Sequence, residues 1–229
     1  MPPVAQATDV TAMAMAKPKP LLRGWFHEAG ALAMVVIGPL IGLEANGAKA
    51  GVCAASVCFA VTAMLTTSAL YHRIDWSPGV RRKMRHADHS MIFVCIAGTY
   101  AAVAGLSLPP VDAWIVLGLV WAASLAGIVI RFAWLDAPKW AVAVPYVAAG
   151  WIAVGAMPEF WHYLGVLGFS LMMAGGLLYT LGAVVYALRR PDPWPKVFGY
   201  HEVFHTCVVA AAALHLSLVA FVLLPATAH

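Results

Sequence analysis

Long apolar runs, separated by short connections, dominate this sequence of 229 residues. A helix needs about 20 mostly apolar residues to cross the hydrocarbon core of a bilayer. Seven runs approach or exceed that length: Ala29–Ala45, Val52–Tyr71, Ser90–Leu106, Ala113–Phe132, Trp140–Met157, Phe160–Leu188 and Val203–Leu224. The connections carry helix-breaking residues, among them Asn46-Gly47, Ser77-Pro78-Gly79 and Pro191-Asp192-Pro193. We therefore expect an all-α membrane protein, a bundle of seven transmembrane helices.

The composition argues against the other common classes of protein. Hydrophobic residues make up 62% of the chain and charged residues only 10%, whereas a soluble domain carries about 25% charged residues. The four cysteines lie in apolar runs without CxxC spacing, so we expect them to be free buried thiols; they are Cys53, Cys58, Cys95 and Cys207. A soluble enzyme, a disordered chain and a secreted disulfide scaffold are all poor fits.

The distribution of Lys and Arg predicts the orientation of the bundle. If the N-terminus lies in the cytoplasm, all fourteen basic residues except Lys49 fall in cytoplasmic segments, as the positive-inside rule requires. An odd number of spans then places the C-terminus outside. Residues 1–20 are expected to form a disordered cytoplasmic tail, without a cleaved signal peptide, and residues 21–229 a single domain. We interpret the net charge of +4 as topology signals and head-group contacts rather than nucleic-acid binding.

The strongest candidate site lies at the start of the last span, in the string His201-Glu202-Val203-Phe204-His205. Residues four apart share one helix face, so the two histidines can point at one ion. The string also matches the HExxH signature of zinc proteases, in which the Glu is the general base. His215 cannot be a further ligand, because ten residues of unbroken helix span about 15 Å. We expect His215 to be a polar packing or pathway residue in the outer half.

A third ligand should come from another span at the same depth, and two segments qualify. The second span ends at His72, with Ser68 one turn earlier on the same helix face, and Asp88 lies at the start of the third span. The predicted topology brings both segments to the side of the membrane that holds His201 and His205. Three neutral imidazoles suit Zn²⁺, and an open fourth position that holds water is the arrangement of catalytic zinc sites.

These motifs resemble those of the haemolysin III family, the bacterial branch of the progestin and adipoQ receptor (PAQR) superfamily. The resemblance covers nearly the whole seven-span core. It is carried by Ser68-x-x-x-His72, by Asp88-His89-Ser90 followed by Ala97-Gly98-Thr99-Tyr100, and by His201-x-x-x-His205 with His215 downstream. The segment Phe26–Ala31 is a weaker match to the family's opening Thr-His-Gly-x-Gly-Ala motif, because Phe26 and Glu28 replace the Thr and the first Gly.

The resemblance implies a zinc ion held by His72, His201 and His205. It implies further that Asp88 contacts the water on the zinc and that Ser68 lies close to the metal. The wider superfamily is similar to alkaline ceramidases, in which the same constellation hydrolyses lipid amides. Bacterial relatives are described as haemolysin-like or channel-like proteins of the plasma membrane, and some are linked to membrane lipid or energy homeostasis.

We predict from these observations a zinc-dependent hydrolase of lipid amides or esters that takes membrane lipids from the inner leaflet, with a lipid amide or fatty acid as ligand. Glu202 is an alternative base, but it points roughly 100° away from His201 on the helix, which favours a role at the cytoplasmic interface or beside the site. The run Arg81-Arg82-Lys83-x-Arg85 is interpreted as a topology signal and head-group patch, placed close enough to Asp88 to grip a lipid phosphate.

Four other functions stay open. A structural zinc would join the second, third and seventh spans, and a lipid sensor would take the lipid as its ligand. A pore would use the outer-half residues Glu44, Asn46 and His215, although the sequence has no wide amphipathic face or ring of charges typical of a pore. An intramembrane protease is suggested by the HExxH string alone, and the missing downstream ligand at the same depth argues against it.

Overall fold

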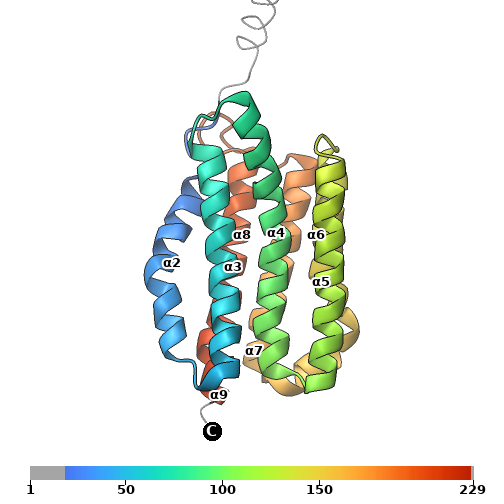
Figure 1. The fold of residues 1–229 in the computed structure, drawn as a ribbon. Helices are drawn as coiled ribbons and strands as arrows, with labels where there is room; N and C mark the ends of the chain where they lie inside the picture. Colours follow the sequence, from blue (N-terminus) through green and yellow to red (C-terminus); the bar gives the residue numbers. More distant parts are fainter. Residues whose placement is uncertain (1–18, 228–229) are drawn as a thin grey trace, which may run out of the picture.

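The computed structural model describes residues 19–227 and forms a bundle of long helices that run along one axis (Figure 1). The elements are α2 (Trp25–Leu43), α3 (Gly47–Arg73), α4 (Pro78–Ser107), α5 (Pro110–Ala133), α6 (Lys139–Gly150), η1 (Ile152–Ala156), α7 (Met157–Leu188), α8 (Tyr200–Leu218), η2 (Val219–Leu223) and α9 (Leu224–Ala226). The prediction of an all-α membrane protein built as a helix bundle is confirmed. The predicted disordered tail falls almost entirely outside the described residues.

Among residues 19–227, six stretches are long and apolar enough to cross a membrane. One of them, Lys139–Leu188, has 50 residues and comprises α6, η1 and α7. Large apolar side chains cover the outside of the bundle: Val35 is 69% exposed and Phe221 76%. Such a surface is unfavourable in water and matches the acyl chains of a bilayer.

The structure differs from the sequence prediction within two of the predicted spans. The span expected over Phe160–Leu188 lies within α7, and the sequence pattern gave no sign that this helix is interrupted at Gly165, whose φ is 63° and ψ −174°. Only glycine adopts this backbone conformation without strain. The residues on both sides of Gly165 are apolar, so hydropathy alone does not reveal the break. The preceding span was predicted as Trp140–Met157, but α6 already ends at Gly150 and is followed by the short 3₁₀ helix η1.

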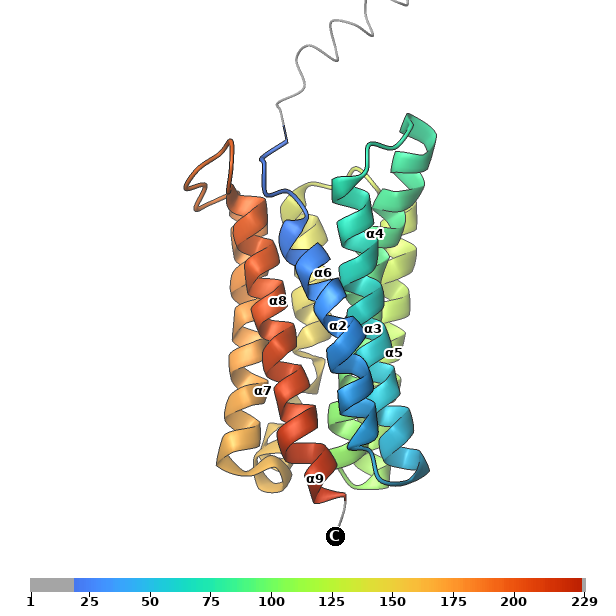
Figure 2. The same cartoon turned by 90° about the vertical axis from the view of Figure 1, so that its left-hand side faces the viewer.

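Helix α4 begins earlier than predicted. It starts at Pro78 instead of Ser90, because proline is favourable at the first helical position. The basic run from Arg81 to Arg85 therefore lies on helix rather than in a connection. Figure 2 shows this first part of α4 rising above the ends of the other helices.

The segment just before α2 ties together two connections at one end of the bundle. The backbone N–H groups of Leu21 and Leu22 donate to the carbonyl oxygens of Lys196 and Val197, each at 3.0 Å. Lys19 forms an ion pair with Asp75 at 2.5 Å. The Lys19 ammonium, by this hydrogen bond and its charge, holds the pKa of the Asp75 carboxyl below its usual range. The segment thus bridges the α7–α8 and α3–α4 connections.

Candidate metal centre

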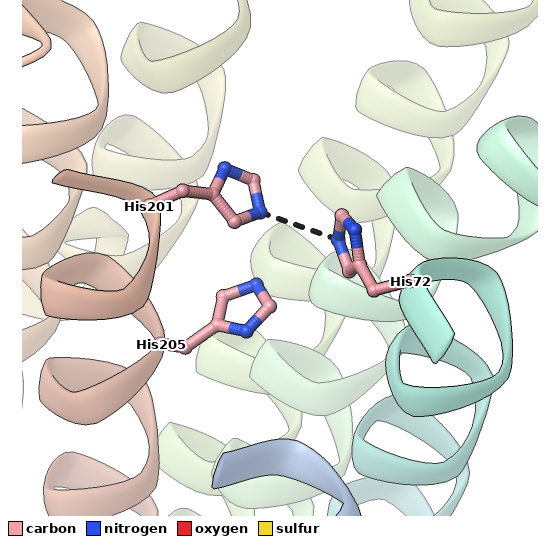
Figure 3. Close-up of side chains that lie close together, drawn as sticks. All are labelled: His72, His201 and His205. Atoms are coloured by element: carbon pink, nitrogen blue, oxygen red, sulfur yellow. Dashed lines mark hydrogen bonds between the residues drawn. The ribbon is translucent and has the colours of Figure 1, made fainter. Parts of the chain in front are cut away.

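The candidate centre is built where the last turn of α3 meets the first turns of α8 (Figure 3). His72 is the penultimate residue of α3, whereas His201 and His205 are one turn apart on one face of α8. Helix α8 runs without interruption past His215, as the argument against His215 as a ligand required. Residues that are 129 positions apart in the sequence therefore face each other across the bundle.

The three imidazoles converge closely enough to hold one ion. The Nε2 atoms of His72 and His201 lie 3.2 Å apart, and one nitrogen from each of the three rings lies within 4.8 Å of the others. Two nitrogens bound to one tetrahedral zinc lie about 3.3 Å apart, because Zn–N bonds are about 2.0–2.1 Å long. In the part of the chain that the structure describes, His205 Nδ1 is buried without a hydrogen-bond partner. These donors fit zinc.

Asp88 lies beside this cluster, on α4. Its Oδ2 is 4.0 Å from His72 Nε2 and 3.8 Å from His89 Nδ1. Both distances are too long for a direct hydrogen bond and suit a carboxylate that acts through one intervening molecule. The Ser68 hydroxyl lies next to the Asp88 carboxylate. The structure thus brings all five predicted site residues, Ser68, His72, Asp88, His201 and His205, to one end of the bundle.

Glu202 has a different environment from that of a catalytic base. It is 0% exposed, its Oε1 accepts a hydrogen bond from Arg23 Nε at 2.5 Å, and its Oε2 accepts one from the Gly199 backbone N–H at 2.8 Å. The second bond satisfies a free donor at the N-terminus of α8. Because both oxygens are engaged, Glu202 orients the start of the helix that carries His201, and the HExxH string lacks the free base of a protease.

His27 belongs to the same cluster, and sequence reasoning gave it no role. Its ring stacks on that of His205, with centroids 3.8 Å apart and planes 7° from parallel. It is 2% exposed, and neither ring nitrogen has a hydrogen-bond partner among residues 19–227. One general rule could have identified His27 from the sequence: an ionisable side chain at the edge of an apolar span is a functional candidate.

A cavity of about 330 Å³ extends from the three histidines into the bundle. Its wall includes α8 residues from His201 to His215. The cavity therefore extends about 15 Å along the helix from His205 to His215. His215 Nε2 donates to the Met172 carbonyl at 3.1 Å. The ring rests against Gly175, where a Cβ atom would lie 2.3 Å from that nitrogen. His215 is therefore a packed polar residue of the cavity wall, as predicted.

Comparison with known proteins agrees with the motifs. A model of the family described as haemolysin-III related matches residues 15–216. The chain is 30% identical to Hemolysin-3 of Bacillus cereus over 204 residues, which cover 87% of this chain and 89% of that protein. It is 31% identical to the Hemolysin-3 homolog of Bacillus subtilis over 126 residues, or 55% and 56% of the two chains.

A more distant relative links the chain to the receptor branch. A stretch of 54 residues is 48% identical to the Adiponectin receptor protein of Drosophila melanogaster, and it covers 21% of this chain and 12% of that one. The long match to the family model and the apolar helices on the outside of the bundle lead to one assignment. The chain belongs to the haemolysin-III-related family, within the PAQR superfamily, and is a multi-pass membrane protein.

Proposed function

We propose that His72, His201 and His205 hold a zinc ion and that the protein hydrolyses lipid amides or esters. The observation that carries this proposal is the convergence of three imidazole nitrogens within 4.8 Å, beside a carboxylate and at the end of a largely apolar cavity. The cavity extends about 15 Å from His205 toward His215, so it can take a large part of an acyl chain. The polar residues that could act on a carbonyl lie together at one end of it. Membrane lipids are the substrates that this arrangement suits.

We propose further that the chain crosses the membrane seven times, with its N-terminus in the cytoplasm. The stretch Lys139–Leu188 supplies two of the crossings, because η1 and the break at Gly165 interrupt it between α6 and the long part of α7. The end of the bundle that holds the three histidines also carries Arg81, Arg85 and Lys139. By the positive-inside rule this end faces the cytoplasm, so the substrate enters from the inner leaflet.

The residues around the site have separable roles in such a hydrolysis. Zinc, when bound, would lower the pKa of a water molecule toward about 7 and polarise a carbonyl group. Asp88 takes the proton of the attacking water, whose oxygen bonds to the carbonyl carbon. It then returns that proton to the leaving nitrogen or oxygen as the C–N or C–O bond breaks. Ser68 holds the Asp88 side chain in place, and Arg23 keeps Glu202 turned toward the start of α8.

Turnover of a lipid panel tests this function. Purified zinc-loaded protein is incubated with N-acyl amides and lysolipids, and the released fatty acid is measured by mass spectrometry. We expect release by the wild type and a loss of about 100-fold or more in Asp88→Asn, because general acid–base catalysis contributes about 10²–10⁴-fold. The variant should keep its zinc, because Asp88 is not one of the three ligands.

Equal turnover by both proteins would contradict the role of Asp88. Blank assays, combined with a zinc-dependent melting temperature, would favour a structural zinc that joins α3 to α8. Blank assays combined with dye release from vesicles would favour a pore. Each alternative therefore has its own result in the same set of measurements.

A second prediction concerns His27, whose ring lies against His205. Replacing it by alanine should lower the zinc affinity by about tenfold, the usual loss when a group that orients a ligand is removed. His27→Phe should keep most of the affinity, because a phenyl ring preserves the stacking contact. A competition titration with a chromogenic chelator measures both values. Wild-type affinity in His27→Ala, or an equal loss in both variants, would contradict a stacking role.

A further inference from the structure

The cavity wall near the three histidines is strongly basic. Its cationic lining residues are Lys19, Arg23, Arg81, Arg85 and Lys139. Among the described residues the only carboxylate in the lining is that of Asp88, so the lining carries an excess of positive charge before any metal is considered. A cavity that binds only neutral lipids does not need this excess of positive charge.

Ion pairs neutralise three of these five cations but leave two. Carboxylates outside the lining pair with Lys19 (Asp75, 2.5 Å), Arg23 (Glu202, 2.5 Å) and Arg85 (Asp136, 2.8 Å). Within residues 19–227, neither Arg81 nor Lys139 has a carboxylate within 4.0 Å. Both side chains are partly buried, which makes an unpaired charge unfavourable. The two are thus available to an anion.

Aromatic rings connect both of these cations to the histidine cluster. The Arg81 guanidinium lies 5.3 Å from the centre of the Tyr71 ring, and Tyr71 contacts His72 at 4.6 Å between ring centroids. The Lys139 ammonium lies 4.2 Å from the centre of the Tyr200 ring and donates to its hydroxyl. Tyr200 in turn neighbours His201 at 6.1 Å. Each unpaired cation is therefore separated from a histidine of the cluster by a single tyrosine ring.

We infer that this end of the cavity binds the phosphate of a lipid head group through Arg81 and Lys139, while the acyl chain lies along the apolar wall. This inference rests on the proposed function and narrows its substrate to acyl lipids with a phosphodiester head group. Arginine and lysine are the usual partners of phosphate oxygens. In a glycerophospholipid the ester carbonyls are only a few bonds from the phosphate, so a phosphate held here leaves an ester beside the three histidines.

A lipid matches this cavity better than a free phosphate does, because the cavity continues past the two cations along an apolar wall. The lining continues away from them with apolar side chains such as Ile92, Ile96 and Val103. A soluble phosphate would make no use of this part of the cavity. A lipid uses both the cationic end and the apolar wall of the cavity, because its head group pairs with the cations and its acyl chain leaves water.

Binding is tested in the Asp88→Asn protein, loaded with zinc, where turnover does not interfere. The probes are phosphatidylglycerol and diacylglycerol with the same fluorescently labelled chains, so that only the head group differs. Arg81→Gln and Lys139→Gln should each weaken phosphatidylglycerol binding by about fivefold or more, since each removes one charged contact. Diacylglycerol binding should not change. Lys139→Arg should keep phosphatidylglycerol affinity, and it remains informative if Lys139→Gln fails to fold.

Arg82→Gln is the matched control, because Arg82 is exposed and adjacent to Arg81 but does not line the cavity; it should bind as the parent does. Unchanged phosphatidylglycerol affinity in both Gln variants would overturn the inference, as would an equal loss for diacylglycerol. Competition by glycerol phosphate at the same concentration as the lipid would overturn the assignment to a lipid. Intact, charge-dependent binding without turnover in the wild type would instead count against the hydrolase and leave the head-group site standing.

Discussion

Replacing His72 by alanine is expected to abolish stoichiometric zinc binding, and His201→Ala should do the same. Each variant leaves only two of the three nitrogens that lie within 4.8 Å of one another. Even groups that merely orient a zinc ligand change metal affinity by about 10–100-fold, so the loss of a ligand should exceed that range. Mass-spectrometric metal analysis after gel filtration should find about one zinc per chain in the wild type and almost none in these variants.

Glu202→Gln is the matched control, because it lies next to His201 on the same helix turn. Its carboxylate is occupied by Arg23 and the Gly199 N–H, so we expect this variant to keep its zinc. It should nevertheless melt at a lower temperature, because the buried ion pair is lost. Added zinc should raise the melting temperature of the wild type but not that of His72→Ala. Full zinc retention without His72 would defeat the assignment of the ligands.

The largest effect on stability is expected for Gly98→Ala, at the contact between α4 and α3. A Cβ atom at Gly98 would lie 2.4 Å from Ala60 Cβ and 3.0 Å from the Ser56 carbonyl oxygen. Neither atom can move unless the backbone of α3 moves, since one is a methyl carbon on Cα and the other belongs to the main chain. Close helix contacts in membranes depend on such small residues. The substitution should cost about 3 kcal/mol, the upper part of the range for overpacking.

Thermal unfolding in detergent measures this effect against two further variants. Gly118→Ala in α5 is the control, because a Cβ atom added at Gly118 would have no neighbouring atom within 4 Å; its stability should change by less than about 0.5 kcal/mol. Adding Ala60→Gly to Gly98→Ala should recover part of the loss, because it removes the closer of the two clashes. Equal stability of the Gly98→Ala and Gly118→Ala proteins would contradict this description of the α3–α4 contact.

The sequence contained enough to predict the helices and the pairing of distant histidines. Apolar runs of bilayer length predict helices, and the breakers at Asn46-Gly47 and Ser77-Pro78 fall where α2, α3 and α4 end or begin. The four-residue spacing of His201 and His205 predicts one helix face. Alternation of direction from one span to the next then brings His72 to the same end of the bundle. The interruption at Gly165 escaped prediction because hydropathy does not change there.

The neighbours of the three histidines could not be predicted in the same way. His27 stacks on His205, and Arg23 pairs with Glu202, because α2 and the segment before it pack against the start of α8. Which helices lie side by side depends on the shapes of whole helix faces, and a linear pattern of apolar residues does not encode them. The same limit applies to Arg81 and Lys139, whose lack of a carboxylate partner among the described residues is visible only once the ion pairs of the other cations are known.

X-ray absorption spectroscopy at the zinc edge tests the central claim most directly, because it reports the atoms bound to the metal in the intact protein. We expect nitrogen and oxygen neighbours at about 2.0–2.1 Å. The outer-shell scattering should be that of the imidazole rings of His72, His201 and His205. Sulfur neighbours at about 2.3 Å, or a zinc without imidazole scattering, would contradict it.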